Sequence, residues 1–328
     1  MAEVEQTPAE TQEPQEPVLV PPRGLVAVTL ALMLLTAAAG VLLAPPAQPR
    51  LQVSLTLDNW RPNEAERDAM VQRDDALLKA WLRHRTPQTT PQFDAIHAQL
   101  LTFFAVEQRM GADGVAQDDA ARKSLGNLEE AVRTLVLTAG ADALRALAVA
   151  FGREVRAAAQ AAVQAAAAKH QSFEQFLSAQ PQPPQAAELA RLAGGIGKAL
   201  AASGIGHGGT LDEPEGLLIE ALAQQRVYDL AVRLPAPAPE LPSDLKRMLM
   251  RYRVEAVDHL DLSRKLQLLR ELEVADATYP AAYARGVLLA RARHCDLALP
   301  AFALAIREGE EPRQAKINAR WCRERLAQ

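Results

Sequence analysis

The sequence predicts an all-α protein, and three observations support this prediction. Aromatic residues make up only 4% of the chain and alanine is abundant, so the β-branched and aromatic runs typical of strands are scarce. Apolar residues after position 58 recur at spacings of three and four, the period of an amphipathic helix. Several of these stretches begin at a capping residue and end at glycine. We therefore expect helices with cores of leucine and alanine.

Residues 1–23 are expected to form a disordered tail, because they are rich in Glu, Gln, Thr and Pro and contain little apolar surface. The tail also carries the formal charge of −4. Its acidic residues, against Arg23 alone, are Glu3, Glu5, Glu10, Glu13 and Glu16. Removing these from the 40 acidic and 36 basic residues of the chain leaves 35 of each. A neutral body offers no field for phosphate backbones, so we expect no nucleic-acid partner.

Residues 24–44 are predicted to form a single transmembrane helix. The segment contains no charged residue, and at 1.5 Å per residue it reaches about 31 Å, the thickness of a bilayer core. A cleaved signal peptide is the alternative, but its first region is usually short and basic. Here that region is long and acidic, and Pro45 and Pro46 follow directly after Ala44. We therefore expect an uncleaved anchor that contacts the lipid bilayer.

The orientation of this anchor is open to two interpretations. Arg23 precedes the span while Arg50, Arg61 and Arg67 follow it, which taken alone favours a cytoplasmic body. The rule is weak for long translocated domains, however, and the tail before the span is short. High alanine and arginine with little lysine suggests a GC-rich bacterial genome. We expect a bacterial inner-membrane protein with a cytoplasmic N-terminus and a periplasmic helical body.

A proline-rich spacer over residues 45–58 is expected to lead into a helical domain over residues 59–234. The pair Asn63 and Glu66 has the spacing of a capping box. The expected helices after the first begin at Thr90-Pro91 and close at Gly111 to Gly114, continue over a third helix that stops at Gly140, and resume from Asp142 through Ala168.

Prolines and glycines divide the second half of the chain. A break is expected at residues 181–210, after which Asp212 to Glu215 caps another helix. A ladder of prolines between Pro235 and Pro242 predicts a boundary before a last domain over residues 243–328.

No motif in the chain predicts catalysis, a cofactor or a metal. Gly204 to Gly209 matches G-x-G-x-x-G, but a helix pattern precedes it where a dinucleotide site needs a strand. Gly197-Lys198 lacks the other residues of a phosphate-binding loop. His97 falls on an apolar stripe and is expected in the core, while acidic pairs such as Asp74-Asp75 are expected to be solvated. We expect no enzyme, and no catalytic, cofactor-binding or metal residues.

The C-terminal segment resembles a tetratricopeptide repeat, a helix-turn-helix unit of 34 residues. The resemblance rests on Tyr279 to Gly286, followed by Leu289, Ala298, Phe302 and Ala305. It implies that Gly286 and Ala298 allow two helices to approach closely and that Phe302 fills the seam between repeats. Upstream, Leu262, Leu266 and Leu269 match more weakly. Residues 313–326 would form a capping helix that packs through Ile317 and Trp321.

The resemblance implies protein–protein interaction through stacked helices. Together with the predicted anchor and the composition, it leads us to expect a membrane-anchored helical scaffold for protein–protein interaction in the bacterial cell envelope. The alternative is an oligomerising structural component of an envelope machine of the secretion or pilus type, in which the chain forms a homo-oligomer. Cys295 and Cys322 are the only cysteines, and an oxidising periplasm would favour a disulfide. Repeat geometry instead places them about 10 Å out of step along the helix axes, so we expect two free thiols.

Overall fold

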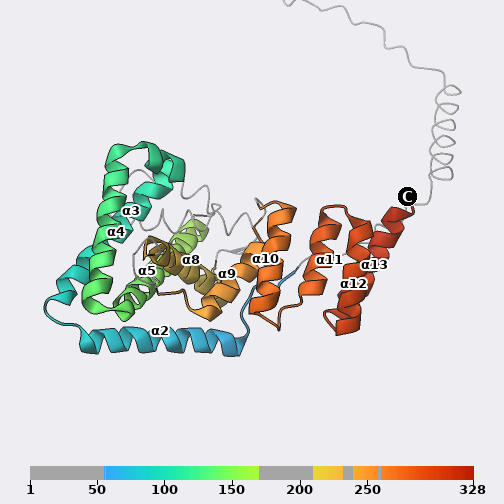
Figure 1. Cartoon of the computed structure of the whole chain (residues 1–328), viewed down its shortest axis with the longest axis horizontal. Coiled ribbons are helices and arrows are strands. Elements are labelled where there is room, and N and C mark those ends of the chain that lie inside the picture. Colours follow the sequence, from blue (N-terminus) through green and yellow to red (C-terminus); the bar gives the residue numbers. More distant parts are fainter. Residues whose placement is uncertain (1–54, 56, 170–209, 232–238, 258–259) are drawn as a thin grey trace, which may run out of the picture. The chain divides into compact units, whose positions relative to one another are not determined.

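A computed structural model of the chain describes residues 55, 57–169, 210–231, 239–257 and 260–328, which all belong to one compact unit (Figure 1). These residues form helices and turns and contain no strand, as an all-α fold requires. The helices are α2 (Glu64–His84), α3 (Thr89–Gln117), α4 (Asp119–Ala139), α5 (Ala141–Ala168), α8 (Glu213–Ala231), α9 (Ser243–Glu255), α10 (Leu262–Ala275), α11 (Ala281–Arg291), α12 (Cys295–Glu308) and α13 (Pro312–Leu326).

Most helix ends lie where the capping residues predicted them. The Asn63 side chain accepts from the Glu66 amide at 2.9 Å while the Glu66 carboxylate accepts from the Asn63 amide at 3.0 Å, a complete capping box. Asp212 and Glu215 make the same reciprocal pair before α8, at 2.8 and 3.0 Å. Gly140 ends α4 with φ of 80°, a conformation that glycine adopts without strain.

The predicted ends of α3 are wrong at both termini. The helix begins at Thr89, one residue before the predicted cap, where the hydroxyls of Thr86 and Thr89 accept each other's amides. It also continues through the glycines at 111–114 to Gln117. Its true end is Asp118, whose side chain accepts from the Ala121 amide at 2.7 Å and thereby starts α4. A strong cap for the next helix decides this boundary.

Helix α5 lies at the centre of the first core and contacts α2, α3, α4 and α8 (Figure 1). Its large side chains Leu144, Leu147 and Phe151 are at most 1% exposed. Small residues bring α8 close: a Cβ on Gly152 would lie 3.0 Å from the Glu220 carbonyl oxygen. The alanine-rich second half of α5 buries one face, including Ala159, and exposes the other. Because the helices approach each other closely, small alanine side chains are large enough to fill the space between them.

Helix α9 joins the first core to the helices that follow. Its Leu245, Met248 and Leu249 belong to the core around α5, whereas Met250 and Val254 pack with α10 and α11. The domain boundary predicted at the preceding prolines therefore does not separate two cores cleanly, because α9 packs into the core before it and into the one after it. The predicted break at 181–210 lies almost wholly outside the described residues.

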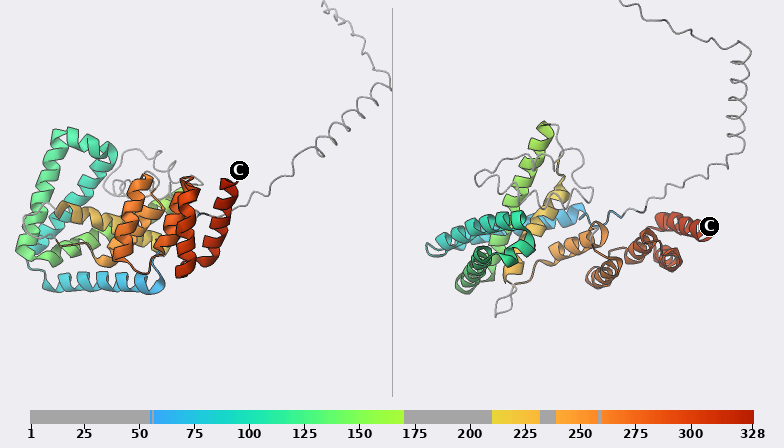
Figure 2. Two further views of the ribbon diagram at one scale, coloured as in Figure 1. Left: turned by 45° about the vertical axis from the view of Figure 1, so that its right-hand side comes forward. Right: turned by 90° about the horizontal axis from the view of Figure 1, so that it is seen from above.

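Helices α11, α12 and α13 pack against one another at the C-terminal end of the chain (Figure 2). Phe302 of α12 is fully buried, as predicted, and lies directly on Gly286 of α11. A Cβ on Gly286 would be 2.5 Å from the Phe302 ring. Ala298 and Ala305 are also fully buried in this cluster. Only glycine at position 286 allows the ring to occupy its place.

The predicted register of the last helix is partly wrong. α13 packs through Ala315, Asn318, Ala319 and Cys322, and Ile317 is 42% exposed. The seam with α12 accepts small side chains, so a bulky isoleucine lies outside it.

The expected separation of the two cysteines is also wrong. Cys295 and Cys322 are both buried and free, and the Cys295 thiol is near enough to Cys322 to help raise the pKa of that residue. This proximity arises because Cys295 begins α12 and Cys322 lies on the packed face of α13.

A buried carboxylate ties the segment before α2 to the helices near the C-terminus. Glu255, at the end of α9, is 5% exposed and accepts from the Tyr279 hydroxyl at 2.6 Å and the Asn59 amide at 3.0 Å. Beside it, Trp60 packs edge-on to Tyr252 with ring centroids 5.9 Å apart. Burial raises the pKa of Glu255 to about 7, although the hydrogen bonds from Tyr279 and the segment oppose this.

None of the helices in the described ranges combines the length and the apolar character that crossing a bilayer requires. The predicted tail at 1–23 and the predicted span at 24–44 lie outside these ranges, as does most of the spacer at 45–58.

Replacement of Gly286 by alanine is expected to destabilise the protein by about 1–3 kcal/mol, because the new methyl group overlaps the Phe302 ring. Gly126→Ala is the matched control. Gly126 lies on an exposed face of helix α4 with no neighbouring atom within 4 Å of an added Cβ, so alanine should stabilise by up to about 1 kcal/mol. Chemical denaturation measures both, and equal effects would contradict the packing of Phe302 on Gly286.

Stability should fall as the pH rises through Glu255's titration. Its pKa is raised from 4.5 to about 7, so its contribution is fully present below about pH 4.5 and lost by about pH 7. The slope from this group approaches about 1.4 kcal/mol per pH unit. Glu255→Gln should remove that slope, while Asp68→Asn, an exposed carboxylate, should leave it unchanged. Denaturation curves from pH 5 to 8 test this, and parallel wild-type and Glu255→Gln profiles would contradict it.

Candidate functional site

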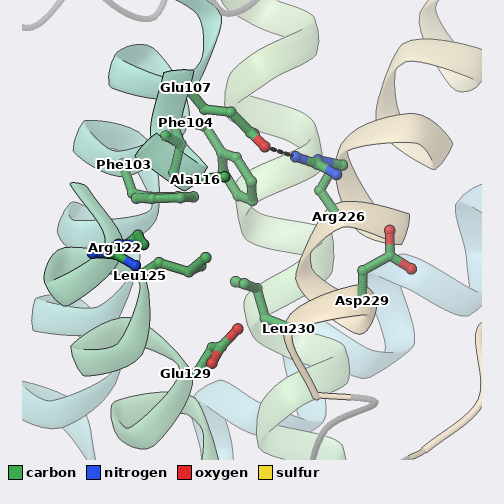
Figure 3. A pocket seen from close by; sticks show the side chains of 11 residues that line it. Phe103, Phe104, Glu107, Ala116, Arg122, Leu125, Glu129, Arg226, Asp229 and Leu230 are labelled. Atoms are coloured by element: carbon green, nitrogen blue, oxygen red, sulfur yellow. Dashed lines mark hydrogen bonds and ion pairs between the residues drawn. The ribbon is translucent and has the colours of Figure 1, made fainter. Parts of the chain in front are cut away.

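A pocket of about 290 Å³ lies between α3, α4 and α8 (Figure 3). It combines an apolar floor with charged side chains at its edge. Its lining residues are Phe103, Phe104, Glu107, Val115, Ala116, Arg122, Leu125, Glu129, Arg226, Asp229 and Leu230.

The floor of the pocket is held rigidly by the core behind it. Phe103, Phe104 and Val115 are at most 5% exposed. The Phe104 ring packs against Phe151 of the central helix α5, with centroids 5.3 Å apart. Leu230 enters from the opposite side on α8 (Figure 3). Because the core packs against the Phe104 ring from behind, this apolar surface is already formed in the protein alone.

An ion pair between Glu107 and Arg226 crosses the pocket from α3 to α8 (Figure 3). The Arg226 guanidinium also lies over the Phe104 ring, 5.3 Å from its centroid. One Glu107 oxygen bonds Arg226, while the other, Oε2, is buried with no hydrogen-bond partner among the described residues. A buried carboxylate oxygen without a donor is costly, so this atom favours a ligand that supplies one.

The charges of the lining are predominantly acidic. Burial raises the pKa of Asp229, while the positive charges of Arg226 and Arg253 oppose that effect. With Glu107 and Glu129 there are three carboxylates against Arg122 and Arg226. Arg122 is already paired with Asp119, which lies outside the pocket lining.

The spacing of residues on α8 explains how one helix serves both the core and the pocket. Arg226, Asp229 and Leu230 are separated by three and four residues, so they share a face. Glu220 and Gln224, also four apart, form another face that turns toward α2 and α5, where Glu220 accepts from Arg156 at 3.0 Å. The buried contacts on this second face fix the rotation of α8 and thereby place the pocket residues.

The acidic pair at 74–75 was expected to be solvated, and for Asp74 this expectation is wrong. Asp74 is 4% exposed and accepts from the Gln224 amide of α8 at 3.0 Å. Asp75 remains at the surface side and pairs with Arg153 of α5 at 2.6 Å. Adjacent residues on a helix point in different directions, so the Asp74 carboxylate lies between α2 and α8 while the Asp75 carboxylate stays near the surface.

His97 is another residue whose predicted environment differs from the structure. Its side chain is partly exposed, and its Nε2 lies 3.1 Å from a carboxylate oxygen of Glu154. Within the described ranges, no group of three or more His, Cys, Asp and Glu side chains is arranged to hold a metal ion. The glycine motifs at 197–198 and 204–209 lie outside those ranges.

Comparison with known proteins does not place the chain in a family. A scan against protein-family models finds no match. No curated protein sequence is significantly similar to it. No solved structure matches it either.

Proposed function

We propose that this protein is a membrane-anchored helical scaffold that binds other proteins, and that the pocket between α3, α4 and α8 receives a side chain of the partner. The observation that carries the proposal is a rigid aromatic floor bordered by charged groups. Protein interfaces concentrate their binding energy in such desolvated pockets, where one apolar side chain is buried and a polar rim excludes water.

The size of the pocket favours a protein segment over a larger cofactor. About 290 Å³ is at the lower limit of pockets that bind small molecules. That space suits one or two partner side chains. Exposed Ala116 and Arg122 lie at the edge, so an approaching helix or loop reaches the floor without displacing buried residues.

The chemistry of the lining favours an apolar side chain next to a lysine or arginine. The apolar part would contact Phe103, Phe104 and Leu230. The cationic group would donate to the unpartnered Glu107 Oε2 or to Asp229. Binding would then add the hydrogen bond that Glu107 Oε2 lacks in the free protein, and a partner without a cation would leave this oxygen unsatisfied.

We assign residues 24–44 as the anchor, in a bacterial inner membrane with the helical body in the periplasm. Residues 243–328 would supply a tetratricopeptide-like unit beside the pocket-bearing helices. Supporting this are Gly286 at a close helix approach and the buried Phe302 and Ala305. Such units bind proteins through stacked helices.

A second candidate function is a homo-oligomeric component of an envelope machine. It is favoured by large apolar residues exposed near the C-terminal end of the chain: Leu297 at 56%, Ile317 at 42% and Leu326 at 54%. Native mass in mild detergent separates the two functions. A fixed large assembly supports the machine, and a monomer or dimer supports the scaffold.

Filling the pocket should abolish partner binding while the fold is retained. Ala116→Trp places an indole at the exposed edge of the pocket, and Ala120→Trp places the same group on exposed α4 surface outside it. A photo-crosslinking amino acid at position 116, but not at 120, should yield one discrete adduct in native membranes. We expect Ala116→Trp to reduce partner recovery by at least about tenfold, the equivalent of about 1.4 kcal/mol, with Ala120→Trp unchanged.

The charge of the pocket is tested separately by Asp229→Asn, which removes a carboxylate at constant size. It should weaken the same adduct, whose partner peptide should carry an apolar residue beside Lys or Arg. Exposed Glu130, which lies outside the pocket, provides Glu130→Gln as the control. Equal adduct yields at 116 and 120, or adducts that are insensitive to Ala116→Trp, would contradict the proposal that this pocket binds the partner.

The anchor is expected to remain in the mature protein, because Pro45 and Pro46 obstruct cleavage after the apolar segment. Mass spectrometry of the mature chain should recover peptides from residues 1–23, and the protein should resist extraction from membranes by carbonate. A new N-terminus between Ala37 and Gln48 would refute the anchor. A body protected from external protease in intact spheroplasts would refute the periplasmic orientation alone.

A further inference from the structure

Two thiols meet inside the C-terminal helical core. Cys295 is the first residue of α12 and Cys322 lies on the packed face of α13. Their exposures are 4% and 0%, and both belong to the cluster that contains Phe302 and Ala319. Burial and the hydrogen-bonded thiol of Cys295 raise the pKa of Cys322 to about 12, so this sulfur is protonated at neutral pH. Neither residue takes part in the pocket.

We propose that Cys295 and Cys322 form a reversible dithiol–disulfide pair, and that its oxidation joins the beginning of α12 covalently to α13. A disulfide requires Cα atoms closer than about 7 Å and side chains that point toward each other. Both cysteines lie in one buried cluster on two helices that pack together, and the thiols are near enough to interact, so the fold brings the pair together for such a bond. The inference is independent of the anchor and of partner binding.

The oxidant is a disulfide, either a small molecule or the oxidised dithiol of another protein. One cysteine sulfur attacks this donor and forms a mixed disulfide, releasing one donor thiol. The second cysteine then attacks the sulfur of the first and releases the other donor thiol. The two thiol protons end on the two donor sulfurs, so the donor is reduced by two electrons and the chain is oxidised by two.

Accessibility sets the order of these steps. Cys295 follows Arg293 and His294, which are exposed, and the chain turns there with φ of 66° at Arg293. Cys322 is enclosed and protonated. Cys295 therefore makes the mixed disulfide when the start of α12 opens locally, and Cys322, whose burial and hence raised pKa are relieved in the opened state, attacks as the thiolate and resolves it before the helix closes.

The bond would act on the last helix, whose fully buried apolar contacts come from small side chains, with Trp321 packed at the edge of the same cluster. Ala315, Ala319 and Cys322 bury little area each, so α13 depends on a narrow seam. A cross-link that closes the loop from 295 to 322 lowers the entropy of the unfolded chain. We expect the oxidised protein to melt about 5 °C higher than the reduced protein.

The experiment uses the full chain in mild detergent, equilibrated with oxidised or reduced glutathione. After acid quenching, intact mass and maleimide labelling under denaturing conditions count the thiols. Oxidation should yield a monomer that is lighter by two hydrogen atoms, has no reactive thiol and shows the higher melting temperature. Reduction should restore both thiols and the lower melting temperature. The same labelling applied to freshly quenched cells gives the state in the native compartment.

Control variants separate the bond from general effects of the oxidant. Cys295→Ala and Cys322→Ala should each lose the shift in melting temperature. The double variant Ala319→Cys, Cys322→Ala keeps two buried thiols in the same cluster but moves one by almost a turn, and it should form the intramolecular bond at least tenfold more slowly.

Several outcomes would overturn the pair. They are two labelled thiols that persist through prolonged oxidation of the folded wild type, a glutathione adduct that never resolves, and disulfides between chains. Because the wild-type mass alone decides among them, poor folding of a variant does not rescue the proposal.

Discussion

The packing of α8 on α5 is the contact on which the other parts of the structure depend. It requires an almost bare helix surface: a side chain at Gly152 would press on the α8 backbone, and one at Gly216 would displace the Arg156 guanidinium. The Arg156–Glu220 ion pair then crosses the same interface. Burial raises the pKa of Glu220 despite this pair, so the pair adds little net stability, but it joins the two helices in a single register. That register decides which α8 residues point into the pocket.

The helices were largely predictable from the sequence because their ends are encoded locally. The capping boxes at Asn63 and Asp212 and the terminal glycine at 140 act within one turn, so they are visible without knowledge of the fold. The environment of a polar residue is not local. Asp74 looked like a surface carboxylate, but its partner Gln224 is supplied from a helix 150 positions further along the chain. The predicted packing face of α13 was partly wrong for a related reason: the side chains of α12 decide how large a residue fits between the two helices.

The pocket could not be predicted from the sequence, since three separate helices build it. Arg226, Asp229 and Leu230 do share a helix face, but such a mixture of charged and apolar residues is typical of any surface helix. What makes them a candidate site is Phe104 opposite, held by Phe151 from the core behind. Neither the distance between α3 and α8 nor the buried Glu107 oxygen has a signature in the sequence.

The buried carboxylates differ in how well they are satisfied, and this difference separates structural groups from recognition groups. Glu255 accepts from Tyr279 and Asn59, and Glu220 accepts from Arg156, so each carboxylate joins segments that are distant in sequence. Glu107, in contrast, retains a buried oxygen, Oε2, that has no donor among the described residues. Satisfied groups define a unique packing, whereas unsatisfied ones reduce the stability of the free protein. A partner that supplies the missing donors offsets that cost only when it is bound. If the proposed partner donates to Glu107 Oε2, the group that weakens the isolated protein is also the one that would select a cationic segment.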